Sequence, residues 1–120
     1  MFDLASFDIA RFEASATEAA KLLRALANER RLMILCQLAG GEKSVGELQP
    51  LVGLSQSALS QHLAVLRQEE VLATRREGQT IWYRIADPAA VKVVSTLAEI
   101  FCPPDMRISH DVPPDPPARP

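Results

Sequence analysis

The sequence has few aromatic residues, no long apolar run and no recognisable export signal. Its 120 residues include one Trp, one Tyr and four Phe, so Leu, Val, Ile and Ala must supply most of the apolar core. No apolar run reaches the roughly 18 residues that a bilayer span requires. The start Met1-Phe2-Asp3 lacks the basic and apolar stretches of a secretory signal. We therefore expect a single small domain in the cytoplasm.

An excess of positive charge is also missing, because the formal net charge is −2 at pH 7. A nucleic-acid-binding protein usually carries a basic patch, so such a function here requires a local distribution of charge. The acidic residues Asp3, Asp8 and Glu13 lie near the start, whereas several arginines gather in the second half. These are Arg67, Arg75, Arg76 and Arg84. DNA binding would then depend on groove contacts and backbone amides as well as on charge.

Cysteine is scarce, and the usual signatures of an enzyme are missing. Cys36 and Cys102 lie far apart in the sequence and do not form the disulfide framework of a small secreted domain. We find no Gly-rich phosphate loop, no nucleophile elbow and no paired carboxylates placed for catalysis. Ser60 and His62 are two positions apart, so on a helix they do not face each other. We expect no enzymatic activity and no cofactor.

The apolar periodicity that is present predicts a mainly α-helical domain with a small β-hairpin. Residues 1–11 are expected to form an N-terminal arm, 12–102 the domain and 103–120, which holds most of the nine prolines, a disordered tail. Helices are predicted over 12–26, 28–39, 44–52, 55–69 and 87–102, and strands over 71–76 and 80–85. The order α-α-α-α-β-β-α is that of a winged helix-turn-helix domain.

The segment from Ser44 to Arg84 carries the signals of DNA binding. A short helix opens with the capping box Ser44-Val45-Gly46-Glu47, and Gly53 allows a sharp turn into the next helix. The second helix of such a pair lies in the major groove, where Gln and Ser side chains can contact bases. The residues expected to do so are Gln56, Ser57, Ser60 and Gln61, joined by Arg75, Arg76 and Gln79 of the hairpin. A polar Gln/Ser face alone is also typical of a solvated helix. The prediction of DNA binding therefore depends on the combination of this face with the preceding turn and the following basic hairpin.

This segment, together with part of the sequence before it, resembles the ArsR family of bacterial repressors. The resemblance is carried by the run from Leu54 to Leu63 (LSQSALSQHL), by Arg75 to Arg84 (RREGQTIWYR) and by Leu26 to Leu32 (LANERRL), and it extends over roughly 16–102. It implies a homodimer joined through its first and last helices. It also implies binding to an inverted-repeat operator in double-stranded DNA and release when an inducer is sensed. The apolar first and last helices independently favour a dimer.

The two metal sites found in many ArsR relatives are not recognisable here. One site uses two Cys on the helix before the reading helix, at positions that resemble Ser44 and Gly46. A hydroxyl group and a bare Cα cannot replace thiolate ligands. The other site uses Asp and His on the last helix, which here has only Lys92 and Glu99 as ionisable residues. We therefore expect no metal.

The contexts of Cys36 and Cys102 resemble a subgroup of ArsR regulators that includes BigR, SqrR and HlyU. In this subgroup two such cysteines lie near each other in one subunit, and reactive sulfur species (persulfide or polysulfide) link them and weaken DNA binding. The resemblance implies that Cys36 and Cys102 are redox-sensing thiols. A buried structural Cys36, a peroxide or disulfide-stress sensor, and a metal sensor using both cysteines with His110 remain alternatives. A winged helix that binds only other proteins, or an activator that displaces other repressors, is also possible on the same scaffold.

Overall fold

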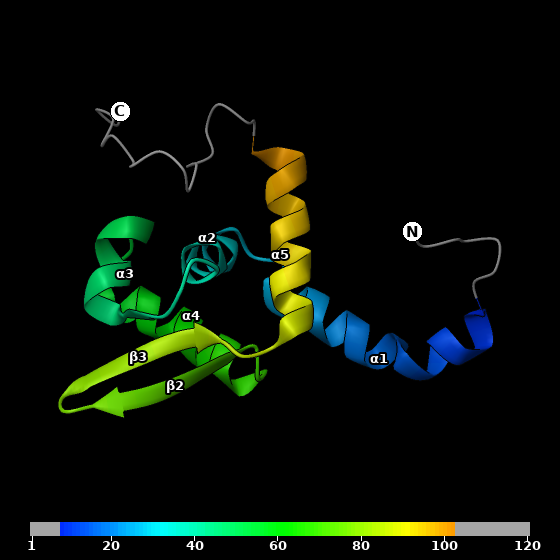
Figure 1. Ribbon diagram of the computed structural model, residues 1–120, viewed down its shortest axis with the longest axis horizontal. Coiled ribbons are helices and arrows are strands. Elements are labelled where there is room, and N and C mark those ends of the chain that lie inside the picture. The colour runs from blue at the N-terminus through cyan, green and yellow to red at the C-terminus, as the bar shows by residue number, and fades with distance from the viewer. Residues whose placement is uncertain (1–7, 103–120) are drawn as a thin grey trace.

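The structure, a computed structural model, describes residues 8–102. The expected arm is therefore described only from Asp8, and the expected tail, with His110, lies outside the described residues. The elements are α1 (Ile9–Leu26), α2 (Glu29–Leu38), β1 (Lys43–Ser44), α3 (Val45–Val52), α4 (Gln56–Gln68), β2 (Leu72–Glu77), β3 (Thr80–Ile85) and α5 (Pro88–Phe101). Figure 1 shows α2, α3 and α4 gathered beside the strands, with α5 standing next to the end of α1. The winged helix-turn-helix prediction is confirmed.

Helix α1 begins earlier than its periodicity predicts. The apolar pattern starts near Phe12, but the helix begins at Ile9 because Asp8 acts as its N-cap. The Asp8 carboxylate accepts a hydrogen bond from the Arg11 backbone N–H at 3.2 Å, which satisfies one free amide of the first turn. Residues that we expected in an irregular arm are therefore helical.

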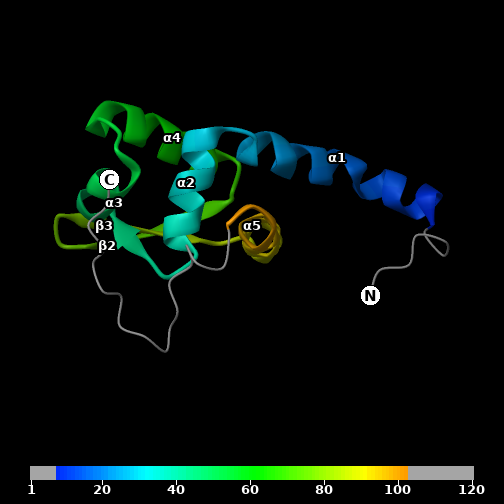
Figure 2. The same cartoon turned by 90° about the horizontal axis from the view of Figure 1, so that it is seen from above.

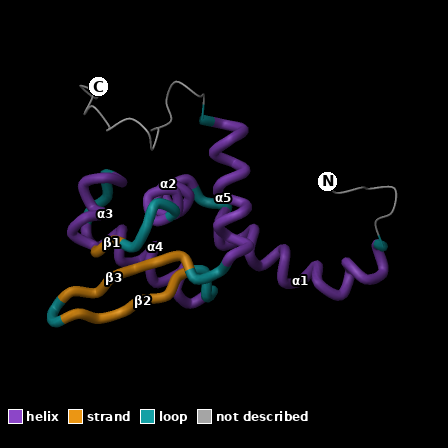
Figure 3. Tube along the Cα trace, viewed as in Figure 1, coloured by secondary structure: helices purple, strands orange, loops and turns teal. Residues whose placement is uncertain are grey.

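The sheet has a third strand that the sequence analysis missed. Strand β3 pairs antiparallel with β2 on one side and with the two-residue β1 on the other, giving the order β1-β3-β2. Figure 3 shows the long β2–β3 hairpin extending from the helices as the wing. Strand β1 immediately precedes α3, so it ties the helix-turn-helix to the base of the wing.

The core lies where α2, α3, α4 and α5 meet the base of the sheet. Buried side chains come from each of these elements. They include Ile34 and Leu35 of α2, Leu48 and Val52 of α3, Leu59, Leu63 and Leu66 of α4, Leu72 of β2 and Val94 of α5. Helix α2 is central, because it contacts α3, α4 and α5 as well as β3.

Two arginines of α2 stabilise the ends of neighbouring helices. Arg31 Nε donates to the Ala25 carbonyl oxygen at 2.6 Å, and its Nη2 donates to the Arg24 carbonyl at 3.3 Å, at the end of α1. Arg30 Nη1 lies 3.5 Å from the Val52 carbonyl, at the end of α3. A cation placed at a helix C-terminus satisfies free carbonyl groups and interacts favourably with the helix dipole.

Large apolar side chains remain exposed on the first and last helices. They are Ile9, Phe12 and Leu23 on α1, and Val91, Ile100 and Phe101 on α5. Figures 1 and 2 show that the N-terminal half of α1 extends away from the other helices. Within residues 8–102, no helix combines the length and the apolarity needed to span a membrane.

Candidate DNA interface and thiol pair

The helix-turn-helix is fixed by local hydrogen bonds that the sequence specifies. Ser44 Oγ accepts from the Glu47 backbone N–H at 3.2 Å, and Glu47 Oε1 accepts from the Ser44 backbone N–H at 3.1 Å, which is a complete capping box. Helix α3 ends at Gly53, whose φ of 66° is left-handed and favours glycine. Ser55 then caps α4 by accepting from the Ala58 N–H at 3.1 Å. These local features fix where α3 begins and ends and where α4 begins.

Helix α4 presents a continuous polar face. Leu59, Leu63 and Leu66 anchor its inner face in the core. The four residues expected to contact DNA, Gln56, Ser57, Ser60 and Gln61, are all exposed. Because residues three and four positions apart are neighbours on a helix, these side chains form one surface over the first half of α4. The structure therefore brings together the residues that sequence analysis selected on this helix.

The wing places its arginines in different environments. Gly78 turns the hairpin with a φ of 63°, and Gln79 and Arg76 are exposed near the tip. Arg76 Nε donates to the Gly78 carbonyl at 3.2 Å. Arg75 lies farther from the tip and faces Trp82 across the hairpin. The two arginines are adjacent in sequence and, because successive strand residues alternate, lie on opposite faces of the wing.

Arg75 is engaged by partners that the sequence analysis did not identify. Its Nε donates to Glu42 Oε1 at 2.8 Å, and its Nη2 donates to the same oxygen. Its guanidinium carbon lies 5.5 Å from the centroid of the Trp82 ring, within the range of a cation–π interaction. The hydrogen bond from Arg75 lowers the pKa of the Glu42 carboxyl below its ordinary value, with further lowering by the charges of Arg75 and Arg84.

The two thiols are far apart in the sequence but come from two helices that pack on each other, α2 and α5. Cys36 lies on α2 and Cys102 follows the last residue of α5; both are free and exposed to solvent, so Cys36 is not the buried structural cysteine of the alternative interpretation. Partial burial raises the pKa of the Cys36 thiol, and the charge of Cys102 raises it further. The two groups are thus close enough to interact electrostatically. A raised pKa lowers the fraction of reactive Cys36 thiolate at neutral pH.

The positions that resemble the metal ligands of other family members serve the backbone instead. Ser44 Oγ is used as the N-cap of α3, and Gly46 lies in the first turn of that helix. Among the described residues, no three His, Cys, Asp or Glu side chains are grouped so that they could hold a metal ion.

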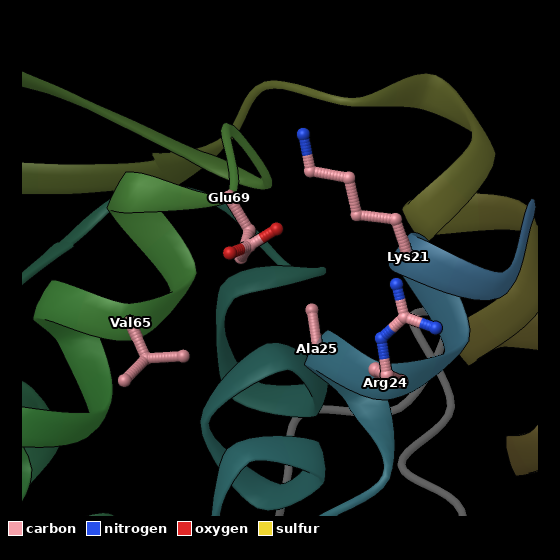
Figure 4. A pocket seen from close by; sticks show the side chains of 5 residues that line it. All are labelled: Lys21, Arg24, Ala25, Val65 and Glu69. Atoms are coloured by element: carbon pink, nitrogen blue, oxygen red, sulfur yellow. The ribbon is translucent and has the colours of Figure 1, made fainter. Parts of the chain in front are cut away.

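A shallow hollow lies between α1 and α4. It is lined by Lys21, Arg24 and Ala25 of α1, by Val65 of α4 and by Glu69, which caps the end of α4, and its volume is about 260 Å³. Figure 4 shows the Lys21 and Glu69 side chains bordering it from the two helices. Small-molecule sites usually measure about 300–1,000 Å³ and are mostly apolar. This hollow is smaller and bordered by charged groups, so it does not have the character of an inducer pocket.

The overall fold, the helix-turn-helix and the wing together place this chain in the class of winged-helix DNA-binding regulators. The family model for "Bacterial regulatory protein, arsR family" matches residues 28–74. A biofilm growth-associated repressor of Agrobacterium fabrum is 44% identical over 86% of this chain and 88% of its own length. The transcriptional activator HlyU of Vibrio cholerae is 44% identical over 82% of this chain and 91% of its own length. The chain belongs to the ArsR family, as its sequence predicts.

Solved structures give the same relationship. The transcriptional repressor BigR of Xylella fastidiosa superposes with a TM-score of 0.76 at 41% identity, covering 81% of this chain and 99% of that one. A homodimeric winged helix-turn-helix DNA-binding domain of Mycobacterium bovis has a TM-score of 0.66 at 31% identity, covering 81% and 89%. The chain is thus related to regulators of the BigR and HlyU type, and its family is one of regulatory proteins rather than enzymes.

Proposed function

We propose that the chain is a homodimeric repressor that leaves an inverted-repeat operator when reactive sulfur species bridge Cys36 and Cys102. The observation that carries the proposal is that α2 packs on α5, with the free and exposed thiol of Cys36 on α2 and that of Cys102 directly after the last residue of α5. Similarity to the transcriptional repressor BigR of Xylella fastidiosa supports repression as the direction of regulation. HlyU, a relative of similar identity, is named an activator.

The DNA contacts follow from the exposed face of α4. Gln56 and Gln61 can each form paired hydrogen bonds with adenine, and Ser57 and Ser60 can reach a base edge or a phosphate. At the wing, Arg76 and Gln79 are exposed near the tip, where Arg suits phosphate or minor-groove contact. Arg75, the third wing residue predicted from sequence, differs because its guanidinium is held by Glu42.

The dimer follows from the apolar side chains left exposed on α1 and α5. A second copy would cover them, and the related Mycobacterium bovis domain is homodimeric. A two-fold dimer reads an inverted repeat when its two reading helices are separated by about one DNA turn, roughly 34–36 Å. Because α5 would form part of that interface, a bridge that ties α5 to α2 would alter this spacing, which gives the thiols a route to DNA affinity.

The chemistry of bridging needs only a sulfane-sulfur donor such as an organic trisulfide. One cysteine thiolate attacks the central sulfur and displaces one thiolate of the donor, leaving a mixed trisulfide on the protein. The second cysteine thiolate attacks the same sulfur and displaces the other donor thiolate. The product is Cys36–S–S–S–Cys102, the two thiol protons pass to the two released thiolates, and the donor is reduced. An inserted sulfur lengthens the reach beyond that of a disulfide, whose Cα atoms must lie within about 7 Å.

The test treats the reduced protein with glutathione trisulfide and follows both intact mass and binding to an inverted-repeat duplex selected with the reduced protein. We expect each subunit to gain one sulfur and lose two hydrogens, and DNA affinity to fall at least tenfold. C36S and C102S should bind DNA like the wild type and not respond. Unchanged affinity of the bridged protein would contradict the proposal.

Hydrogen peroxide and zinc form the comparison arms of the same experiment. Equal release by peroxide would favour the general oxidant sensor. Stoichiometric zinc binding that changes DNA affinity would favour the metal sensor.

A further inference from the structure

The wing arginines are separated by the geometry of the hairpin. Arg75 pairs with Trp82, and Arg76 pairs with Ile81. Since strand side chains alternate between faces, Arg76 shares its face with Leu72, which is buried against the helices. Arg75 and Trp82 share the opposite, outer face. Of these two arginines, only Arg76 therefore projects from the helix-side face of the wing, the face on which Leu72 is buried.

The outer face holds a cluster that spans all three strands. Glu42 directly precedes β1, Trp82 lies on the central strand β3, and Arg75 lies on β2. Arg75 reaches across the Trp82 ring to Glu42, with two N–H groups donating to one carboxylate oxygen. Within the described residues, Trp82 Nε1 is buried and has no hydrogen-bond acceptor. Packing against its neighbours, the Arg75 guanidinium among them, therefore holds the ring in place.

We propose that Glu42, Arg75 and Trp82 form a wing clamp, which fixes the wing to the segment after α2 and leaves Arg76 as the wing arginine that contacts DNA. The different roles of Arg75 and Arg76 are supported by the groups that accept their hydrogen bonds. Arg75 would have to leave a carboxylate and an aromatic face to bind phosphate, and hydrogen bonds between charged partners are the stronger kind. Arg76 would leave only the neutral Gly78 carbonyl.

The wing clamp makes Glu42 and Arg75 positioning residues. Glu42 follows Gly41 in the loop that leaves α2, so the ion pair joins this loop to β2. Without it, β2 and β3 would still pair, but the hairpin would lose one attachment to the rest of the domain. The proposal is independent of the thiol chemistry, since it concerns the reduced protein only.

Trp82 provides the first readout, because it is the only tryptophan of the chain. In the full-length protein, E42Q and R75Q should each shift the emission of Trp82 to longer wavelength, since the ring loses its cover and gains water. The matched control is E77Q, because Glu77 lies 3.8 Å from Arg75 at a more exposed position and makes no short contact with it. E42Q combined with R75Q should shift the emission no further than either change alone.

DNA binding provides the second readout, with the selected duplex titrated between 50 and 300 mM salt. Each phosphate contact contributes about 0.9 to the slope of log K against log salt. R76Q should therefore reduce the slope by roughly 0.9–1.8 per dimer, whereas R75Q should weaken binding equally at every salt concentration. The proposal is overturned if R75Q reduces the slope as much as R76Q does, or if E42Q leaves the Trp82 emission unchanged.

Discussion

Replacing Glu70 by glycine should stabilise the protein, because Glu70 is the one non-glycine residue with a positive φ, 64°, among residues 8–102. It follows the last residues of α4 and lies in a Schellman motif. The Val71 N–H donates to the Leu66 carbonyl at 2.9 Å, and the Glu70 N–H donates to the Arg67 carbonyl at 3.0 Å. Val71 and Leu66 are both buried, which completes the motif.

The size of the effect follows from two opposing contributions. A left-handed conformation costs an L-residue with a Cβ roughly 1–2 kcal/mol, and glycine avoids this cost. The greater freedom of glycine in the unfolded chain offsets about 0.5–1 kcal/mol of that gain. We therefore expect E70G to raise the free energy of unfolding by about 0.5–1 kcal/mol per protomer. For a domain of this size that is an increase in Tm of roughly 2–8 °C.

The assay is thermal and urea unfolding at one fixed protomer concentration, because dimerisation makes Tm concentration-dependent. E70A is the matched control, since it removes the carboxylate and keeps the Cβ. It should give no comparable gain. Equal stabilisation by E70A and E70G would show that the charge near the end of α4 matters and not the backbone conformation. DNA affinity should be unchanged in E70G, because the turn keeps its geometry.

Three further predictions test the helix caps, the reading face and the thiol. R31M should lower the free energy of unfolding by about 1–2 kcal/mol, because carbonyl groups at the end of α1 lose a charged donor; urea unfolding measures it. Q61A should weaken binding to the selected duplex by about 1–3 kcal/mol without changing the salt slope, whereas Q68A at the end of α4 should bind like the wild type. In the C102S variant, reaction of Cys36 with glutathione trisulfide should keep accelerating as pH rises above the ordinary thiol value of 9.0, because burial raises its pKa. The raised pKa means that the folded state favours the neutral Cys36 thiol. The contribution of Cys36 to the stability of the fold is therefore complete below the ordinary thiol pKa of 9.0 and is lost as pH rises through the higher pKa of the folded state.

The helix-turn-helix could be predicted because its signals are local. The serine and glutamate of the capping box lie three residues apart, and Gly53 marks the left-handed turn. Each of these features is set by neighbours in the sequence, and the structure shows the corresponding bonds. The face of α4 follows in the same way, since helical periodicity alone separates Gln56 and Gln61 from the buried leucines.

The wing clamp could not be predicted, because it depends on contacts between distant segments. Strand β1 is two residues long and has no periodicity of its own; it exists because Lys43 and Ser44 pair with Tyr83 and Trp82. Without β1, nothing in the sequence places Glu42 beside Arg75. The proximity of the two thiols likewise depends on the packing of α2 against α5, and the sequence indicated it only through the family resemblance.

If bridging of Cys36 and Cys102 releases DNA, then bound DNA must in turn oppose bridging. If bridging weakens DNA binding by a given factor, bound DNA must oppose bridging by the same factor, because the coupling between two ligands is reciprocal. Each tenfold change corresponds to about 1.4 kcal/mol. In a buffer of glutathione trisulfide and glutathione, saturating duplex should therefore shift the equilibrium between dithiol and bridged protein toward the dithiol. The shift, summed over both subunits, should equal the ratio of affinities measured separately by titration. A duplex that slows bridging but leaves this equilibrium unchanged would show that DNA only shields the thiols, and that bridging does not change the dimer in the way release requires.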